Sequence, residues 1–271
     1  MEFVVSNAGV VSEKELWNEN FITGHSVYEV IRIIDGTPLF CDDHFARLLV
    51  SAQLGGFNFR MEFSEFQAHI SVLISQNQKL NGNVKFVFSE TENQSHWLFS
   101  FIPHSYPSPE DYSKGVKVGL LMAERENPNA KLIQNAVRSV ADQMIVEQNL
   151  YEVLLVDRHH KITEGSRSNV FFVKGEMLYT APPTQVLVGI TRQKVFECLK
   201  QLDLIVIEES VAVSEMNQFE AAFLTGTSPK VLPISSIGNQ KFETQLQSVQ
   251  KLMDYYDEMI DGYLKLFYCG G

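Results

Sequence analysis

The chain has 271 residues, 45% of them hydrophobic and 11% aromatic, which is enough apolar side chain to build one large domain or two smaller ones. Its 33 acidic residues outnumber its 22 Lys and Arg, and the net charge of −11 disfavours binding to nucleic acid or to an anionic membrane. The N-terminal residues lack a basic segment followed by an apolar run, and nowhere do about 18 consecutive apolar residues occur. We therefore expect a globular cytoplasmic protein with no membrane anchor and no nucleic-acid partner.

Strand and helix patterns alternate in the first hundred residues. Turn signals occur at Asp35-Gly36 and Asn81-Gly82. Asp42 and Asp43 are candidate helix caps, and Ser64 with Gln67 has the spacing of a capping box. These signals predict strands at 26–34, 38–40, 84–89 and 97–102, and helices at about 42–53 and 64–78.

A linker is predicted at about 103–115, where Pro, Ser and charged residues occur without apolar periodicity. It separates a smaller N-terminal α/β domain, 1–105, from a larger C-terminal domain, 116–271. The predicted elements of the larger domain are strands at 116–124, 151–157, 169–173, 177–180 and 204–209 and helices at 136–149, 191–202 and about 243–266. The sequence thus predicts an α/β protein of mixed α+β type, a fold class that does not by itself name a function.

The most informative motif runs from Glu164 to Arg192. It reads EGSRSNVF, then LYT after six residues, and LVGITR after six more. In this order and spacing it resembles the signature of the class IV aminotransferases, the fold-type IV pyridoxal-phosphate (PLP) enzymes, which include branched-chain and D-amino acid aminotransferases and aminodeoxychorismate lyase. Further matches are GHSVYEVIR at 24–32, HFARL at 44–48, AKLIQN at 130–135 and FLTGTS at 223–228.

The resemblance implies a two-domain fold like that of D-amino acid aminotransferase, with PLP as cofactor. It also implies amino acid and 2-oxo acid substrates and a homodimer. No metal site is expected, because the three cysteines are far apart in the sequence and the pair His159-His160 has no Cys or acidic partner at metal-binding spacing.

Two residues match the chemical centre of the family. Lys131 matches the catalytic lysine of the larger domain, whose amine binds the cofactor covalently and moves a proton between substrate and cofactor. Glu164 matches the carboxylate that pairs with the pyridine nitrogen and keeps it protonated. The alternatives are a surface lysine and a solvated carboxylate in a turn.

Other matches concern the cofactor phosphate. Gly189, Ile190 and Thr191 lead into a predicted helix whose first N–H groups are suited to bind phosphate oxygens. Arg47 matches the family's phosphate-binding arginine, although an exposed helix charge is the alternative. Thr227 matches a residue of a tight turn near phosphate and substrate, where Gly226 permits close approach of the backbone.

Three residues match positions near the substrate in the family. The phenol of Tyr28 is suited to donate to a carboxylate, or else packs in the core. Lys85 lies where relatives have a side chain that binds the substrate carboxylate, and the alternative is a solvated face of a sheet. Ser228 follows Thr227, and an ordinary turn is nearly as good an interpretation of it.

The resulting hypothesis is a PLP-dependent aminotransferase of branched-chain or D-amino acid type. The alternatives are a 4-amino-4-deoxychorismate lyase, which releases pyruvate and p-aminobenzoate, and a non-catalytic PLP-binding paralogue. Residues 89–93 lack the arginine and glycine that relatives often have there, and Ala136 replaces the tyrosine of branched-chain enzymes. Because of these two departures, the sequence does not determine which substrate the protein uses.

Overall fold

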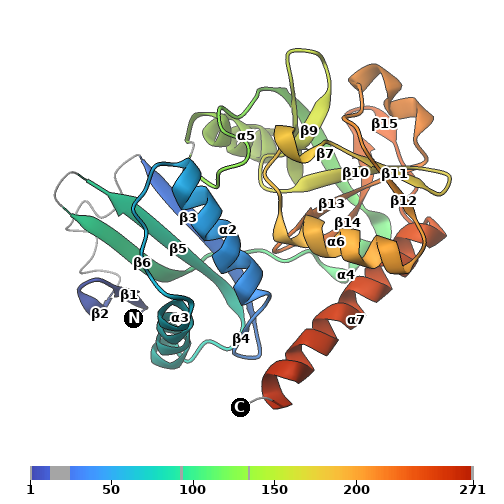
Figure 1. The fold of residues 1–271 in the computed structure, drawn as a ribbon. Coiled ribbons are helices and arrows are strands. Elements are labelled where there is room, and N and C mark those ends of the chain that lie inside the picture. The colour runs from blue at the N-terminus through green and yellow to red at the C-terminus, as the bar shows by residue number, and fades with distance from the viewer. Residues whose placement is uncertain (1, 13–24, 92–93, 134, 270–271) are drawn as a thin grey trace. The chain divides into compact units, whose positions relative to one another are not determined.

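The computed structural model describes residues 2–12, 25–91, 94–133 and 135–269 and divides into two units (Figure 1). Unit 1 comprises Met1–Ser105, Ala130–Ile133 and Asp261–Gly271, and unit 2 comprises Tyr106–Asn129 and Gln134–Ile260. The first break between the units lies inside the predicted linker. Lys131 groups with unit 1, whereas the sequence analysis placed it in the larger C-terminal domain. The physical reason is backbone pairing, because Leu132 forms a β-bridge with Val27 and the N–H of Ile133 donates to the carbonyl of Ser26 at 3.0 Å.

Unit 1 is built on a six-stranded sheet in the order β2-β1-β6-β5-β3-β4. Alternate residues of its strands face two helices, and together they form one core with Leu48 from the first helix and Phe66 from the second. This alternation places Ile31 toward the helices and Tyr28 on the opposite face. The elements are β1 (Phe3–Ser6), β2 (Gly9–Ser12), β3 (Ser26–Ile34), β4 (Thr37–Pro38), α2 (Cys41–Leu54), α3 (Phe63–Asn77), β5 (Gly82–Glu90) and β6 (Ser95–Ile102).

Both helices of unit 1 were predicted, but not the way in which they start. Phe40, in a left-handed conformation with φ 51°, is the N-cap of α2, and Glu62 is the N-cap of α3, neither with a side-chain capping bond. The predicted caps at Asp42 or Asp43 and at Ser64 are therefore wrong. These acidic and polar residues lie inside the first turn of each helix, where a carboxylate still interacts favourably with the helix dipole.

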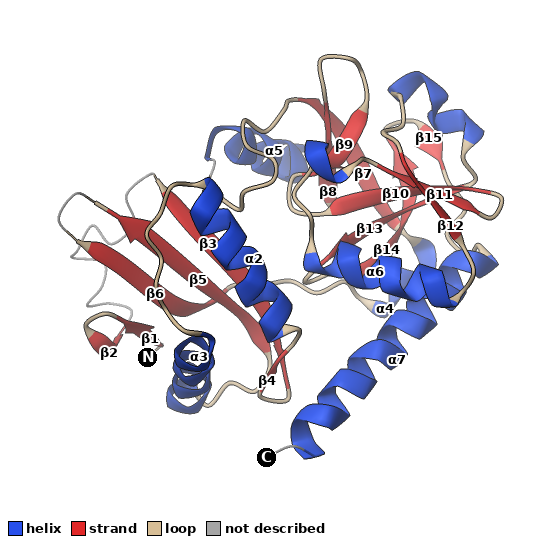
Figure 2. Ribbon diagram, in the orientation of Figure 1, coloured by secondary structure: helices blue, strands red, loops and turns tan. Residues whose placement is uncertain are grey.

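Unit 2 contains a nine-stranded sheet, ordered β12-β11-β10-β13-β14-β7-β8-β9 with β15 paired to β14 (Figure 2). Helix α5 packs on β7 and β8, and α6 packs on β13. The sequence did not predict the central hairpin of β13 and β14. The elements are α4 (Pro109–Lys114), β7 (Val116–Met122), α5 (Asn135–Gln148), β8 (Glu152–Val156), β9 (Ile162–Gly165), β10 (Asn169–Lys174), β11 (Met177–Thr180), η1 (Pro183–Gln185), α6 (Ile190–Gln201), β12 (Ile205–Glu208), η2 (Val213–Gln218), β13 (Ala221–Gly226), β14 (Lys230–Ile237), β15 (Gln240–Lys241) and α7 (Gln247–Cys269).

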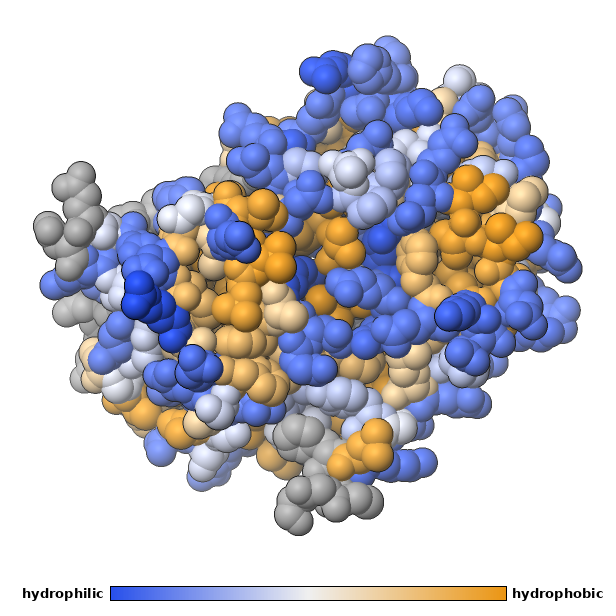
Figure 3. All heavy atoms as spheres, viewed as in Figure 1, coloured by the Kyte–Doolittle hydropathy of each residue, from blue (hydrophilic) through white to orange (hydrophobic). Residues whose placement is uncertain are grey.

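The outer face of α2 is unusually apolar. Leu49, Val50 and Leu54 are exposed by 43, 54 and 59%, and Figure 3 shows apolar surface over this helix. Among the described residues, no helix has both the length and the apolar character needed to cross a membrane.

Candidate functional site

Lys131 is fixed in unit 1 by its backbone. Its carbonyl accepts a hydrogen bond from the N–H of Tyr28 at 3.1 Å, and its own N–H donates to Ser51 Oγ at 3.2 Å. The side-chain Nζ lies 4.9 Å from the centre of the Tyr28 ring, and the residue is half-buried. The lysine is therefore held between β3 and α2 rather than projecting from a mobile surface.

Lys85 shares the same aromatic ring. Its Nζ lies 5.4 Å from the centre of the Tyr28 ring, across the pairing of β3 with β5. Two amines thus surround one phenol, on the sheet face opposite α2 and α3. Such a cluster of positive charge and hydroxyl is suited to bind a carboxylate.

Arg47 belongs to a buried ionic network in the same unit. Its Nε and Nη2 donate to the two oxygens of Glu29 at 2.8 and 2.7 Å, and His44 Nδ1 donates to Glu29 at 2.8 Å. Although burial opposes ionisation, the Arg47 charge and the hydrogen bonds from Arg47 and His44 hold the pKa of Glu29 well below its usual range. Burial lowers the pKa of His44, so its ring is neutral and donates from Nδ1. Arg47 is therefore no exposed helix charge.

Glu164 lies in unit 2, near the end of β9, and is buried, with 3% of its surface exposed. Arg125 Nε is 2.9 Å from its Oε1, an ion pair without hydrogen-bond alignment, and the N–H of Leu187 donates to its Oε2 at 3.2 Å. The interpretation as a solvated turn carboxylate is therefore wrong. A buried carboxylate is suited to pair with a protonated ring nitrogen.

The N-terminus of α6 lies beside Asn169. Gly189 is the N-cap and makes no side-chain capping bond, and Asn169 Nδ2 donates to the carbonyl of Leu187 at 2.9 Å. A Cβ atom at Gly189 would lie 2.4 Å from Asn169 Oδ1, so a larger residue would require Asn169 or the start of α6 to move. Thr191 is buried in the first helical turn, where N–H groups lack acceptors within the helix.

The remaining predicted residues lie at the turn between β13 and β14. Gly226 ends β13, and Thr227 and Ser228 form the turn before Pro229. A Cβ at Gly226 would lie 3.1 Å from the Pro229 ring. Thr225, just before this turn, is buried and its Oγ1 has no hydrogen-bond partner among the described residues.

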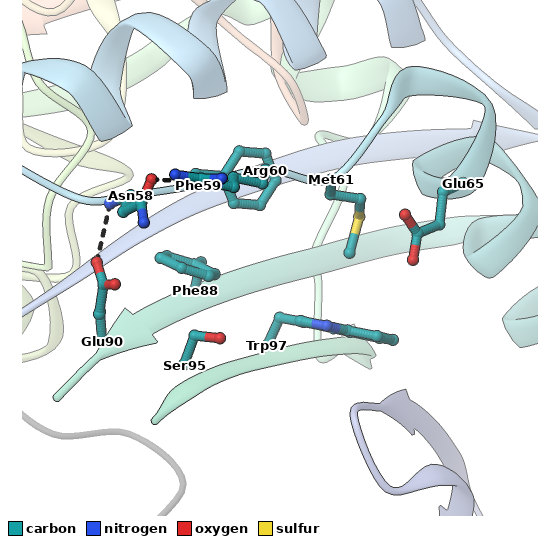
Figure 4. Close-up of a pocket in the computed structure, with 9 residues that line it drawn as sticks. All are labelled: Asn58, Phe59, Arg60, Met61, Glu65, Phe88, Glu90, Ser95 and Trp97. Atoms are coloured by element: carbon teal, nitrogen blue, oxygen red, sulfur yellow. Dashed lines mark hydrogen bonds between the residues drawn. The ribbon is translucent and has the colours of Figure 1, made fainter. Parts of the chain in front are cut away.

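A separate pocket of about 320 Å³ opens in unit 1, on the side of the sheet that carries the helices (Figure 4). Phe88 and Trp97 form part of its wall, and a chain of hydrogen bonds links Arg60 to Asn58 and Asn58 to Glu90. Tyr28 lies on the opposite face of the same sheet. No predicted site residue lines this pocket.

Sequence reasoning missed the partners of the predicted residues. Glu29 had one signal, since it is a charged residue on the same face of β3 as the core residues Val27 and Ile31. Arg125 and Thr225 gave none, because their surroundings arise from distant strands. No group of three or more His, Cys, Asp or Glu side chains within the described ranges has the arrangement of a metal site.

Comparisons with known proteins agree on the family. The model of the family "Amino-transferase class IV" matches residues 26–237. A D-alanine aminotransferase of Bacillus licheniformis is 28% identical over 231 residues, which cover 80% of each chain. A probable branched-chain-amino-acid aminotransferase of Thermotoga maritima is 29% identical over 223 residues, covering 80% of this chain and 79% of the relative. The chain therefore belongs to the class IV aminotransferase family.

Solved structures show the same fold. The branched-chain amino acid aminotransferase of Escherichia coli superposes with a TM-score of 0.85 at 19% identity, covering 96% of this chain and 94% of that one. A Legionella pneumophila protein provisionally assigned as 4-amino-4-deoxychorismate lyase gives 0.79 at 21% identity, covering 87 and 91%. The predicted mixed α/β fold of fold-type IV is thus confirmed.

Proposed function

We propose that this chain is a pyridoxal-phosphate-dependent aminotransferase that moves an amino group between an amino acid and a 2-oxo acid. The observation that carries the proposal is the placement of Lys131. Its backbone is hydrogen-bonded to β3 and α2, and its amine lies against the ring of Tyr28. A lysine restrained in this way is suited to bind an aldehyde covalently.

The residues present fit the cofactor. The buried Oγ1 of Thr225 has no partner among the described residues, and Gly189, the N-cap of α6, makes no side-chain capping bond to the first N–H groups of the helix. Both features suit a phosphate at the start of α6. The residues proposed to hold the phosphate are Arg47, Gly189, Ile190, Thr191, Gly226 and Thr227, with Glu164 at the ring nitrogen.

Each residue has a distinct task in the proposed reaction. Bound PLP withdraws electrons from the substrate, so that a proton can leave the α-carbon. Lys131 Nζ would accept that proton and later give it back, so that the same amine would serve first as base and then as acid. The carboxylate of Glu164 favours a protonated ring nitrogen, while Arg47 orients the phosphate with a guanidinium whose plane Glu29 fixes.

We propose that Tyr28 and Lys85 bind the substrate carboxylate and that Ser228 contributes to the substrate site. The position of the Lys85 amine, 5.4 Å from the centre of the Tyr28 ring, supports the first assignment. The similarity to a D-alanine aminotransferase and to a probable branched-chain-amino-acid aminotransferase favours branched-chain or D-amino acids as substrates. Homodimer assembly and a cytoplasmic location remain predictions that follow from the resemblance and the composition.

An absorbance titration with PLP tests the proposal. Wild type should develop a visible band that Lys131→Ala does not, because only the lysine amine bonds to the aldehyde. Borohydride reduction followed by peptide mass mapping should locate the cofactor on Lys131. The matched control is Lys251→Ala, an exposed lysine of α7, which should behave as wild type.

A panel of D- and L-amino acids should then bleach the band and identify the donor. Release of p-aminobenzoate from aminodeoxychorismate would instead favour the lyase. A PLP band that no donor bleaches would favour the non-catalytic paralogue. Identical spectra of wild type, Lys131→Ala and free cofactor would contradict the proposal.

A further inference from the structure

Thr225 lies on the face of the unit 2 sheet that α6 covers. It pairs with Asn169 across β13 and β10, two residues from the pair of Phe223 with Phe171. Phe171 stacks on Phe223 and contacts Phe196 of α6, with ring centres 5.0 and 5.9 Å apart. Because residues two apart on a strand share a face, the side chain of Thr225 is on the α6 side.

The hydroxyl of Thr225 is buried without a hydrogen-bond partner among the described residues. Thr225 is 1% exposed, and its Oγ1 has no hydrogen-bond partner in the described part of the chain. Burying a hydroxyl without a partner costs free energy, and valine would fill the same volume without that cost. A ligand that offers an acceptor to this hydroxyl would remove that cost.

The start of α6 is adjacent. Asn169, directly across from Thr225, donates to the carbonyl of Leu187. Its Oδ1 lies 2.4 Å from the position that a Cβ atom of residue 189 would take. The side chain of Asn169 thus connects the strand pair to the N-cap of α6. In antiparallel pairs, opposite side chains are about 5 Å apart, so the side chain of Thr225 lies beside that of Asn169, which itself contacts the segment that leads into α6.

We infer that Thr225 is a phosphate-binding residue, whose Oγ1 donates a hydrogen bond to a phosphate monoester bound at the N-terminus of α6. The inference rests on the proposed function, which supplies such a phosphate as part of PLP. It adds a donor that neither the motif nor the resemblance identified. The helix end provides N–H groups and positive potential, and Thr225 provides the hydroxyl.

The test compares Thr225→Val, which keeps the shape and loses the hydroxyl, with Thr225→Ser, which keeps the hydroxyl. Dissociation constants of the full chain are measured for PLP and for pyridoxal, which lacks the phosphate. The valine variant should bind PLP about tenfold to hundredfold more weakly, the range for a hydrogen bond to a charged group. Its affinity for pyridoxal should equal that of wild type, and the serine variant should bind PLP nearly as wild type does.

Thermal unfolding without cofactor separates a binding role from a structural one. Thr225→Val should unfold at the same temperature as wild type or higher, because it removes an unsatisfied buried group. A lower unfolding temperature, equal weakening of PLP and pyridoxal, or unchanged PLP affinity would overturn the inference.

Failure of the proposed function gives a different result. If wild type binds no PLP, inorganic phosphate becomes the probe, and the readout is the rise in unfolding temperature. A rise in wild type that Thr225→Val abolishes would support Thr225 as a donor to another phosphate ligand. No rise in wild type would overturn the inference together with the proposed function.

Discussion

Glu29 holds the guanidinium of Arg47 by two hydrogen bonds of 2.8 and 2.7 Å, one to each carboxylate oxygen. The Glu29 side chain is fully buried and that of Arg47 is 9% exposed. A fork of this kind fixes the plane of the guanidinium and thus the direction of its other N–H groups. Glu29 is therefore a positioning residue for Arg47.

Replacement of Glu29 by Gln should lower the free energy of unfolding by about 3 kcal/mol, because Arg47 becomes a buried cation without its counter-charge. Urea unfolding of the protein without cofactor measures the loss. Glu176→Gln is the matched control, since Glu176 is exposed in the turn before β11, and it should change stability by less than about 0.5 kcal/mol. Equal effects of the two substitutions would show that the fork contributes no net stability.

The same network predicts how stability depends on pH. Glu29 and His44 both have a lowered pKa in the folded protein, so the unfolded chain takes up their protons first as the pH falls. Stability should be full above the ordinary His pKa of 6.5, decline below it through His44, and decline further below 4.5 through Glu29. Each group contributes at most about 1.4 kcal/mol per pH unit.

Urea midpoints at pH 8, 6, 5 and 4 test this dependence. His44→Asn is the control, because its amide N–H can replace the Nδ1 donor without titrating. The variant should lose the decline between pH 6.5 and 5 and keep the decline below 4.5. An unchanged profile in His44→Asn would mean that other groups cause the pH dependence.

The sequence predicted the fold where local patterns are strong. The strand at 26–34 is confirmed as β3, and the helix at 136–149 is α5 within one residue at each end. The helix starts were wrong, because Phe40 adopts a left-handed conformation that no cap preference indicates. The hairpin of β13 and β14 was not predicted, since its strands are mostly buried and lack the alternation of a half-exposed strand.

The residues of the candidate site also fall into those that local motifs indicate and those that depend on tertiary contacts. Motif spacing led to the proposal of Lys131 and Glu164, whose residue types and intervals lie within short segments. It did not identify Glu29, Arg125 or Thr225, because these meet their partners only through tertiary contacts. Glu29 is 18 residues from Arg47, and Thr225 meets Asn169 only across paired strands.

Gly189→Ala should lower both stability and PLP affinity. Its Cβ would lie 2.4 Å from Asn169 Oδ1, so either Asn169 or the N-cap of α6 must move, at a cost of about 1–3 kcal/mol. Gly262→Ala is the matched control, because a Cβ there meets nothing within 4 Å and the residue lies inside α7. That control should gain about 0.5–1 kcal/mol. Denaturant unfolding and a PLP titration of both variants measure the effects, and a neutral Gly189→Ala would show that Asn169 adapts without cost.

Arg125→Met tests the pairing of Glu164 with the cofactor ring. Without Arg125, the buried carboxylate of Glu164 retains the N–H of Leu187 but loses its cation, so the cofactor-free variant should be less stable by about 3 kcal/mol. If Glu164 pairs with a protonated ring nitrogen, PLP supplies the missing positive charge. Saturating PLP should then raise the unfolding temperature of Arg125→Met by more than that of wild type.

The double variant Arg125→Met with Glu164→Gln completes the cycle. It removes both charges, so it should recover part of the lost stability and show no extra stabilisation by PLP. An equal or smaller rise with PLP in Arg125→Met than in wild type would instead mean that the ring nitrogen does not lie against Glu164.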